Sequence, residues 1–468
     1  MPADSRAQSP EAQTPRADSR TLASRVADAT HQNAFLCYQC QRCSSGCPMA
    51  QHLDLLPSEV MRAIQEGDES VAASRTVWLC ASCQTCNTRC PQGLDIPGII
   101  DHFRQQTLEQ ASVPEQGRFF KAFLRNIRLF GRAYEAGLMA ELNLRDGKPL
   151  RDVDLGIAML RKGKLKLFPH FARTPGRVNR VGTATNRVAY YPGCSLQSAG
   201  QAYDRSFRGV ARALGIELCE IPGWTCCGAT PAHGSDPITA MVLPLKNLST
   251  VEKMGLDRAV APCAACYSRL RSSVRHHREQ GDLADRVDEV LGRDYQDSVK
   301  VLNVLDCLAE AGPQVVAERV QKPLSGLKVA CYYGCLLTRP PADTGSLEPE
   351  NPAGMDRIVR ELGAEPLEWT RKTDCCGGSL AITQTPIAKR LTAEILKEAR
   401  ARGADLIATA CPLCQLNLDE RQPEMAGDLG FTIPAVYVTQ LMAVALGLPE
   451  ADQALTQAAV APTPLFHE

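Results

Sequence analysis

The residues in this sequence best suited to chemistry are its cysteines. The chain has 468 residues and 21 cysteines, and its first twenty residues lack the apolar core of a signal peptide. Most of the cysteines stand in Cys-x-x-Cys pairs, which in a reducing compartment indicate metal binding or redox chemistry. A disulfide framework is disfavoured, because secreted disulfide scaffolds are usually small. We therefore expect a cytoplasmic protein whose thiols bind metal.

The first eight cysteines form two runs with the same spacing. Residues 37–48 read CYQCQRCSSGCP and residues 80–91 read CASCQTCNTRCP, so each run is CxxCxxCxxxCP. Bacterial two-cluster ferredoxins use this run, and its fourth cysteine ligates the other cluster. Zinc is the alternative, but zinc ribbons use two CxxC pairs per metal, and two identical runs ending in Cys-Pro fit iron–sulfur better. We predict two cubane 4Fe–4S clusters, the first bound by Cys37, Cys40, Cys43 and Cys90 and the second by Cys80, Cys83, Cys86 and Cys47.

Ten further cysteines belong to an internal repeat. VAYYPGCS at residues 188–195 matches VACYYGCL at 329–336, and GLDRAVAPCAAC aligns without a gap to GADLIATACPLC. Each copy carries the order C…CCG…CxxC: Cys194, Cys226, Cys227, Cys263 and Cys266 in the first, and Cys335, Cys375, Cys376, Cys411 and Cys414 in the second. Three cysteines remain. Cys331 aligns with Tyr190 and is not expected to be a ligand, and Cys219 and Cys307 are expected to be small buried fillers.

Five thiols in this order exceed what an ordinary cluster needs. A cubane takes four ligands, and two adjacent cysteines do not easily reach two corners of one compact cubane. They could bind neighbouring irons if one thiolate bridged two metals, which would give an unusual, more open cluster. A structural metal, or a cubane with one spare cysteine, remains an alternative because four-ligand sites dominate structural cases. The spacing alone leaves this choice open.

The elements that must position these cysteines can be read from the apolar pattern. AVAPC at 259–263 and LIATAC at 406–411 are short apolar runs typical of buried strands, and each follows a helical segment that ends in Gly. Helix, Gly, strand and CxxC is the order of an α/β unit, which places the cysteines at the carboxyl edge of a sheet. Around the first eight cysteines, LPSEVMRAIQEG and IPGIIDHFRQQ predict helices.

The predicted fold is therefore an α-helical ferredoxin domain followed by two repeated α/β cysteine-rich (CCG) domains. Residues 101–187 carry 17 Lys and Arg against 8 Asp and Glu, which indicates either a solvated connector or a docking face for an acidic partner or an anionic membrane surface. The expected divisions are a disordered tail at 1–32, the two-cluster domain at 33–105, a basic helical connector at 106–187, the two cysteine-rich domains at 188–325 and 326–450, and a flexible tail at 451–468.

Composition excludes several classes of function. The formal net charge is zero, which argues against a general nucleic-acid binder. The sequence contains no run of about 18 apolar residues, so we predict no transmembrane helix. No GxGxxG follows a predicted strand, so we expect neither flavin nor NAD on this chain and place the two-electron donor on another chain.

These motifs together resemble heterodisulfide reductase. CYQCQRCSSGCP and VWLCASCQTCNTRCPQGLDIPGII are similar to its C subunit. YYPGCS, CCGA, YYGCLLTRP, PENPAGMDRIVRELGAE, CCGG and ACPLCQLNLDERQ are similar to its B subunit. The resemblance covers residues 33–450, and the fusion of C-like and B-like parts departs from the separate subunits of that family.

The resemblance implies a mechanism. Each five-cysteine set would hold a noncubane 4Fe–4S cluster, and a substrate disulfide would lie between the two and be reduced or reversibly formed. The cubanes would pass electrons one at a time from a flavoprotein similar to the A subunit of heterodisulfide reductase. His233, Tyr267 and Tyr333 lie near the cysteine motifs, and we expect them to pack or to support the clusters rather than to move protons.

A different class of function has similar modules. The iron–sulfur subunits of glycolate oxidase and of anaerobic glycerol-3-phosphate dehydrogenase pass electrons from a flavin partner toward quinone without a substrate of their own. In such a complex the basic connector would make peripheral contact with the membrane. Because both five-cysteine sets are complete here, disulfide chemistry is the favoured expectation.

Overall fold

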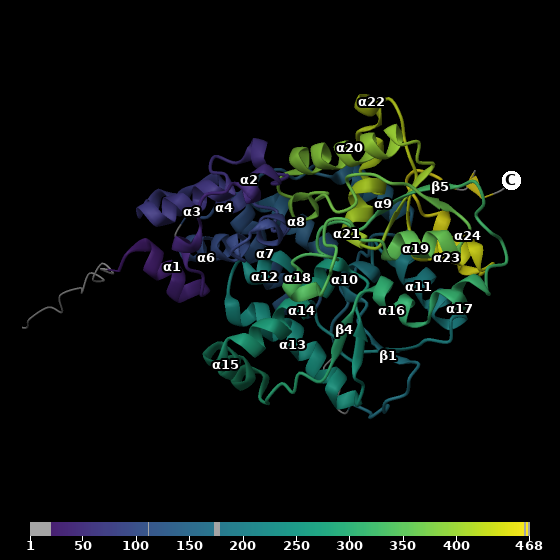
Figure 1. The fold of residues 1–468 in the computed structure, drawn as a ribbon, viewed down its shortest axis with the longest axis horizontal. Helices are drawn as coiled ribbons and strands as arrows, with labels where there is room; N and C mark the ends of the chain where they lie inside the picture. The colour runs from purple at the N-terminus through teal and green to yellow at the C-terminus, as the bar shows by residue number, and fades with distance from the viewer. Residues whose placement is uncertain (1–19, 111, 173–177, 463–464, 467–468) are drawn as a thin grey trace, which may run out of the picture.

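The computed structural model describes residues 20–110, 112–172, 178–462 and 465–466, and it confirms a helical N-terminal part followed by two α/β parts (Figure 1). The N-terminal helices, purple in the figure, lie at one end of the molecule. The first sheet, in teal, and the second, in green to yellow, lie below and above one another in this view. The blue helices α7 and α8 of the basic segment lie, in this view, between the N-terminal helices and the two sheets.

The N-terminal part is built from short helices around a small apolar core. Pro57 opens α3 and Gly67, with φ of 76°, ends it, as the sequence predicts. Met61 and Ile64 of this helix are fully buried. The helices are α1 (Leu22–Thr30), α2 (Arg42–Ser45), α3 (Pro57–Glu66), α4 (Arg75–Leu79), α5 (Thr85–Arg89) and α6 (Ile96–Leu108).

Both predicted tails need correction where the structure describes them. Residues 1–19 lie outside the described part, but α1 buries Leu22 and Val26 against α3 and α6, so residues 22–30 are part of the N-terminal core. At the other end α24 (Glu450–Leu455) packs on α11, and Asp419 accepts hydrogen bonds from the backbone N–H groups of Ala459 and Val460. Isolated apolar residues in Ala-rich segments gave too weak a pattern to predict this packing.

The basic segment is helical, as expected, with α7 (Glu115–Phe130), α8 (Glu135–Arg145) and α9 (Val153–Arg161). Gly131 ends α7 in a left-handed conformation, with φ of 73°. Helices α7 and α8 pack against each other, and α7 also packs on α12 (Ala229–His233). The segment is therefore more than a solvated link, because it lies against both cysteine-rich parts.

Each α/β part contains a four-stranded parallel sheet. The first has the order β2-β1-β3-β4 and the second the order β6-β5-β7-β8. The strands are β1 (Arg187–Tyr190), β2 (Glu217–Glu220), β3 (Arg258–Val260), β4 (Lys300–Leu302), β5 (Lys328–Tyr332), β6 (Glu365–Pro366), β7 (Leu406–Thr409) and β8 (Ala435–Tyr437). In both sheets the chain leaves the first strand for one edge and then returns to pair on its other side, which creates a switch point at the carboxyl ends of the central strands.

Helices cover the sheets. In the first part they are α10 (Gly193–Leu196), α11 (Gln201–Ala213), α12, α13 (Pro237–Met254), α14 (Ala264–Glu279), α15 (Gly281–Leu291), α16 (Val304–Glu310) and α17 (Pro313–Ala317). In the second they are α18 (Pro341–Thr344), α19 (Gly354–Glu361), α20 (Thr385–Ala401), α21 (Pro412–Gln415), α22 (Ala426–Leu429), α23 (Val438–Ala445) and α24. Helices α13 and α20 precede β3 and β7, as predicted.

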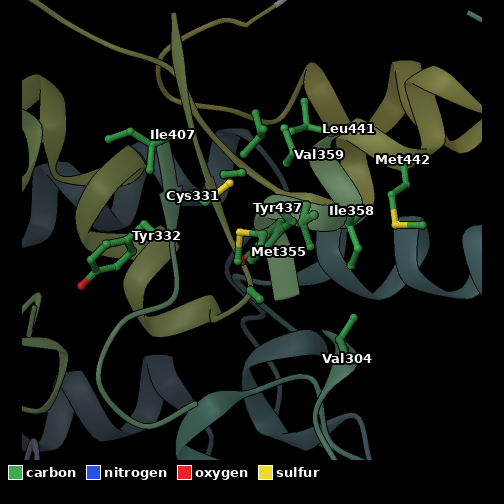
Figure 2. Packing of buried hydrophobic residues seen from close by; sticks show 14 of the residues in the cluster. Val304, Cys331, Tyr332, Met355, Ile358, Val359, Ile407, Tyr437, Leu441 and Met442 are labelled. Atoms are coloured by element: carbon green, nitrogen blue, oxygen red, sulfur yellow. The ribbon is translucent and has the colours of Figure 1, made fainter. Parts of the chain in front are cut away.

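One apolar core joins the two α/β parts. It surrounds the second sheet, where Figure 2 shows Cys331 and Ile407 facing Val359 and Leu441, and it continues into residues of the first sheet. The Tyr203 ring stacks on the Tyr437 ring at 4.2 Å between centroids. The two repeats thus bury a shared surface and form a single rigid support. Within the described residues, no helix has the length and apolar character that crossing a bilayer requires.

Candidate metal centres

Each repeat builds the same frame around its cysteine doublet. The Tyr191 hydroxyl donates to the carbonyl of Thr225, the residue before the first doublet, at 2.7 Å. In the second repeat the Tyr332 hydroxyl donates to the carbonyl of Asp374, also at 2.7 Å. The end of the first strand therefore fixes the doublet loop, and the internal symmetry of the sequence extends to individual hydrogen bonds.

A glycine before the first cysteine of each set is required for space. Gly193 and Gly334 have φ of 71° and 69°. A Cβ atom on Gly193 would lie 3.1 Å from Cys266 Sγ, and one on Gly334 would lie 3.0 Å from Cys414 Sγ. Any side chain at either position would be strained and would press on a thiol of the same set.

All ten cysteines of the two repeats line a single cavity of about 240 Å³, here called the ten-cysteine cavity. Cys227 Sγ lies 3.3 Å from Cys266 Sγ, and Cys376 Sγ lies 3.6 Å from Cys414 Sγ. Cys263 of the first repeat lies close enough to Cys411 of the second for each thiol to shift the pKa of the other. The structure thus brings each predicted set together and also places the two sets next to each other.

The thiols of the two doublets have opposed acidities, with the same pattern in both repeats. Hydrogen bonding to Cys194 raises the pKa of the Cys226 thiol well above its usual value, whereas a hydrogen bond from Cys226 lowers that of Cys227. In the second repeat Cys335 raises the pKa of Cys375, and Cys414 lowers that of Cys376. Ten thiols this close, eight of them buried, cannot all become thiolates unless positive charge joins them.

This donor set fits iron–sulfur clusters. Thiolate is the ligand that iron–sulfur clusters take, and the irons supply the positive charge that neighbouring thiolates need. Among the described residues, no three His, Cys, Asp or Glu side chains converge as they would around a single metal ion. The thiols are instead distributed along the wall of a cavity.

The eight N-terminal cysteines fall into two groups. Cys47, Cys80, Cys83 and Cys86 line one cavity of about 30 Å³. In the other group, Cys40 and Cys90 both lie near the Tyr38 ring, and Cys37 lies near Cys43. Cys47 therefore lies with the second run and Cys90 near Cys40 of the first, and the two crossed ligand sets stay a prediction. Burial raises the pKa of Cys47 to about 12, with the neighbouring thiols adding to the effect.

A buried arginine orders the second run. Arg104 of α6 is 1% exposed. Its guanidinium donates to the carbonyls of Val77 and Cys80 at 2.7 and 2.6 Å and to Ser82 Oγ at 3.0 Å, and it pairs with Asp101 at 2.9 Å. Because it forms a fork of fixed geometry, this side chain ties the loop of the run to the following helix. The helical pattern of the sequence gave no sign of this role.

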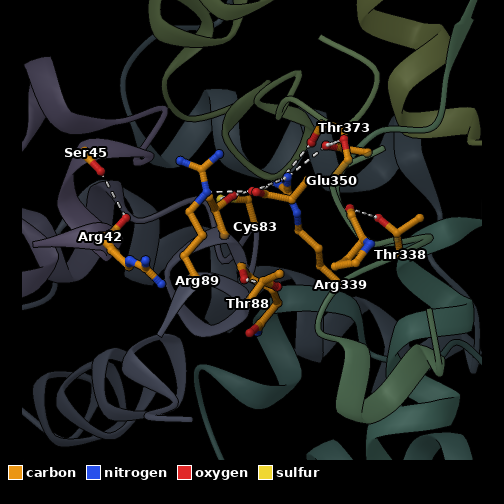
Figure 3. A network of polar contacts seen from close by, with 12 residues as sticks. Arg42, Ser45, Cys83, Thr88, Arg89, Thr338, Arg339, Glu350 and Thr373 are labelled. Carbon is orange, nitrogen blue, oxygen red and sulfur yellow. Dashed lines mark hydrogen bonds and ion pairs between the residues drawn. The ribbon is translucent and has the colours of Figure 1, made fainter. Parts of the chain in front are cut away.

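The N-terminal part contacts the second repeat at the cysteines themselves. Cys83 lies close to Cys375 in one apolar cluster, and the Ser379 hydroxyl donates to the carbonyl of Ala81 at 3.0 Å. Figure 3 shows Arg89 and Arg339 converging on Glu350 beside this contact. A cysteine of the second N-terminal group thus lies next to a cysteine of the second repeat.

The basic segment contributes to the site, which the sequence did not indicate. The backbone N–H of Ala133 donates to Cys194 Sγ at 3.3 Å, and the N–H of Cys226 donates to the carbonyl of Gly131 at 2.9 Å. Phe119, Phe123, Glu135 and Leu138 line the ten-cysteine cavity. Burial raises the pKa of Glu135 to about 7, although Ser198 and Lys166 oppose the shift. The sequence did not point to these residues, because a run of charged residues is more often simply exposed to solvent. Only the tertiary packing places them at the cavity.

The other residues near the motifs have structural partners. His233 Nδ1 lies 2.5 Å from Asp101 Oδ2, and the Tyr267 hydroxyl donates to the carbonyl of Thr344 at 3.4 Å. Tyr333 lines the cavity, but its hydroxyl lies 2.5 Å from Asp356 Oδ2. Of the leftover cysteines, Cys307 is buried as expected, and Cys331 is buried as well. Cys219 is partly exposed on the edge strand β2, which corrects its prediction as a buried filler.

Comparison with known proteins identifies the families of the N-terminal part and of the two repeats. The cysteine-rich domain family, CCG, matches residues 188–271 and 329–419, and the 4Fe–4S dicluster domain family matches residues 33–94. The 8-methylmenaquinol:fumarate reductase membrane anchor subunit of Wolinella succinogenes is 32% identical over 282 residues, which are 59% of this chain and 98% of that protein.

Components of heterodisulfide reductase are also similar. The B subunit of the ferredoxin/F420H2-dependent CoB-CoM enzyme of Methanosarcina acetivorans is 27% identical and covers 58% of this chain and 94% of its own. The D subunit of the dihydromethanophenazine enzyme of Methanosarcina barkeri is 23% identical, over 56% of this chain and 59% of its own. A solved structure of a hypothetical protein from Helicobacter pylori shares the fold, with a TM-score of 0.58 at 9% identity over 94% of this chain and 75% of that one.

The chain has two complete cysteine-rich repeats after a dicluster domain, and it covers nearly the whole of a relative that is 32% identical to it. These two findings establish its family. The chain belongs to the cysteine-rich iron–sulfur oxidoreductase subunits that include the B and D subunits of heterodisulfide reductase.

Proposed function

We propose that this chain reduces, or reversibly forms, a substrate disulfide in the ten-cysteine cavity, with electrons that arrive through the N-terminal clusters. The observation that carries the proposal is that both five-cysteine sets line one cavity. A disulfide has two sulfur atoms, and two facing metal centres could each hold one. A site that only relayed electrons would have no need for a shared cavity.

The proposed ligands follow the predicted groupings. Cys37, Cys40, Cys43 and Cys90 would hold one cubane 4Fe–4S cluster, and Cys80, Cys83, Cys86 and Cys47 the other. Each five-cysteine set would hold a noncubane 4Fe–4S cluster, as the resemblance to the B subunit of heterodisulfide reductase implies. When bound, such clusters supply one-electron transfer and Lewis acidity toward sulfur.

The chain's own residues would prepare the cavity for this reaction. Reducing RSSR′ to RSH and R′SH takes two electrons and two protons. The aromatic and aliphatic wall from α7 and α8 would exclude water from the sulfur atoms, and the Tyr191 and Tyr332 hydrogen bonds would hold both doublets in place. The contact of Cys83 with Cys375 favours electron entry through the second repeat.

A partner must supply the electrons. The similar proteins from Methanosarcina are named as parts of heterodisulfide reductases, and we propose that this chain likewise works in a reductase complex with a flavoprotein. The purified chain alone is expected to show little turnover with NADH. Robust NADH-dependent disulfide reduction by the single chain would contradict this.

Metal content and spectroscopy test the proposal directly. The chain, purified without oxygen, is expected to contain about sixteen irons, for four clusters of four. Adding thiols should change the electron paramagnetic resonance spectrum of the oxidised protein. About eight irons, or a spectrum that no thiol changes, would confine the chain to electron relay.

A second candidate function is electron delivery to or from a quinone. The relative from Wolinella is named as a membrane anchor subunit of an enzyme that uses a menaquinol. Several large apolar side chains on the basic segment are exposed, among them Leu150, Phe168 and Phe171, as on proteins that dock to a bilayer surface. Cosedimentation with vesicles containing about one third anionic lipid, compared with neutral vesicles, would test this docking.

A further inference from the structure

We propose that the ten-cysteine cavity is selective for disulfides with uncharged, apolar substituents and discriminates against anionic ones. This inference rests on the proposed disulfide function and adds the class of substrate. It concerns the part of the cavity wall that the basic segment provides rather than the cysteines.

The part of the lining that α7 and α8 contribute is largely apolar. Phe119 and Phe123 of α7 and Leu138 of α8 line the cavity and pack together with Ile382 of the second repeat. Pro231 and Leu413 extend this surface on either side. An apolar substituent placed here would gain roughly 25 cal/mol for each Å² of surface removed from water.

The charged side chain in the cavity lining, Glu135, would repel an anionic substituent. Among the described residues, Glu135 is the only carboxyl that lines the cavity, and no Lys, Arg or His does so. Glu135 is the first residue of α8, so its carboxylate already occupies the helix N-terminus, where an anion would otherwise be stabilised. At pH 8 the Glu135 side chain would be ionised in most molecules, because its pKa is about 7.

The cations nearest to Glu135 do not line the ten-cysteine cavity. Lys166 and Arg132 line a separate cavity of about 30 Å³ on the other side of Glu135. The Arg132 guanidinium stacks on the Trp224 ring at 3.8 Å from its centroid and donates to the Trp224 carbonyl at 3.1 Å and to Gln197 Oε1 at 3.2 Å. An anionic substituent in the ten-cysteine cavity would therefore lose its water without gaining a cationic partner, and it would face a like charge.

The test compares two aromatic disulfides of nearly the same shape. One is the symmetrical disulfide of 4-(hydroxymethyl)benzenethiol, which is neutral, and the other is that of 4-mercaptobenzoate, which is anionic. The full-length protein with its clusters is reduced by a viologen dye at pH 8, and kcat/KM is measured for each. Calorimetric binding of the two corresponding thiols gives a readout that does not depend on turnover.

The neutral disulfide is expected to be favoured by at least about tenfold in kcat/KM, and its thiol should bind more tightly by a similar factor. Glu135→Gln should narrow the preference, and Glu135→Lys should abolish or invert it. Glu141→Gln is the matched control, because Glu141 lies on the same helix, pairs with Arg125 and Arg145, and does not line the cavity. It should leave the preference unchanged.

Each outcome separates this inference from the function beneath it. Equal kcat/KM values and equal thiol affinities would overturn the selectivity and leave the disulfide function standing. A preference that Glu135→Gln and Glu141→Gln change alike would overturn the role of Glu135. If neither disulfide is reduced, neither thiol binds, and a soluble naphthoquinone is reduced instead, the proposed function itself fails. If Glu135→Lys does not fold, the wild-type comparison and Glu135→Gln still decide the matter.

Discussion

The two cysteine-rich repeats have the same internal frame but different neighbours. In both, a tyrosine hydroxyl at the end of the first strand holds the carbonyl before the doublet at 2.7 Å, and a left-handed glycine leaves room for a thiol of the CxxC pair. At its cysteines, however, the first repeat meets the basic segment, whose Ala133 N–H donates to Cys194 Sγ. The second meets the N-terminal part, whose Cys83 contacts Cys375.

This difference suggests a division of labour between two similar centres. The frame within each repeat fixes the thiols, whereas the neighbouring segment decides what can reach them. The second five-cysteine set lies beside the N-terminal cysteines, and the first lies beside the basic segment that contributes to the cavity lining. The following predictions test this asymmetry, from the largest expected effect to the smallest.

Removing one doublet cysteine from each repeat should give different variants. Cys226→Ser and Cys375→Ser should each lose about four of sixteen irons and more than about 100-fold in disulfide reduction, since even supporting residues of a metal site are worth 10–100-fold. After Cys226→Ser the second centre should still be reduced by a viologen dye; after Cys375→Ser the first should be reduced slowly. Iron analysis and electron paramagnetic resonance measure both. Equal reduction of the remaining centre in the two variants would remove the asymmetry.

The contact between the N-terminal part and the second repeat should depend on Arg339. This side chain is 3% exposed and donates to Thr85 Oγ1 at 2.8 Å and to the Thr373 carbonyl and hydroxyl at 3.1 and 2.8 Å. Arg339→Ala should lower the free energy of unfolding by about 2–4 kcal/mol, because buried acceptors lose charged donors.

Arg89→Ala is the matched control for Arg339. Arg89 pairs with the same carboxylate, Glu350, at 2.6 Å but is about one third exposed, so its loss should cost less than about 1 kcal/mol. Urea denaturation of both variants gives the comparison. If both variants lost a similar free energy of unfolding, the buried Arg339 guanidinium would not be what holds the N-terminal part against the second repeat.

If the two repeats hold their cysteine doublets in the same way, Tyr191 and Tyr332 should contribute equally to the free energy of unfolding. Tyr191→Phe and Tyr332→Phe each leave one buried carbonyl without its donor and should each cost about 1–3 kcal/mol in free energy of unfolding. Burial raises the pKa of both hydroxyls well above the usual value, so neither effect should change between pH 6 and 9. Thermal or urea unfolding at both pH values provides the measurement. A large difference between the two variants would show that the two hydrogen bonds, although alike in geometry, differ in energy.

Cys219 provides the smallest expected effect. It is partly exposed on β2 and does not line the ten-cysteine cavity. Cys219→Ser should leave the iron content unchanged and alter the free energy of unfolding by less than about 0.5 kcal/mol. Loss of iron in this variant would mean that the division between ligands and fillers is wrong.

Much of the fold and of the cysteine groupings followed from the sequence. The strands before Cys263 and Cys411, the helices that end at Gly67 and Gly255, and the two parallel sheets were all expected. These features are local, since they depend on apolar periodicity, on caps and on fixed short spacings between thiols. The helix at Leu22–Thr30 and the packed C-terminus were missed because their few apolar residues acquire meaning only against distant partners.

The sequence by itself determined which thiols can act together, because spacings such as CxxC and the internal repeat restrict the chain over a few residues at a time. Only the tertiary structure decided that both five-cysteine sets line one cavity, that Cys83 lies against Cys375, and that Glu135 and the phenylalanines of α7 line the same cavity. These contacts join residues from 59 to 292 positions apart in the chain. They depend on how whole helices and sheets pack, which no local spacing records.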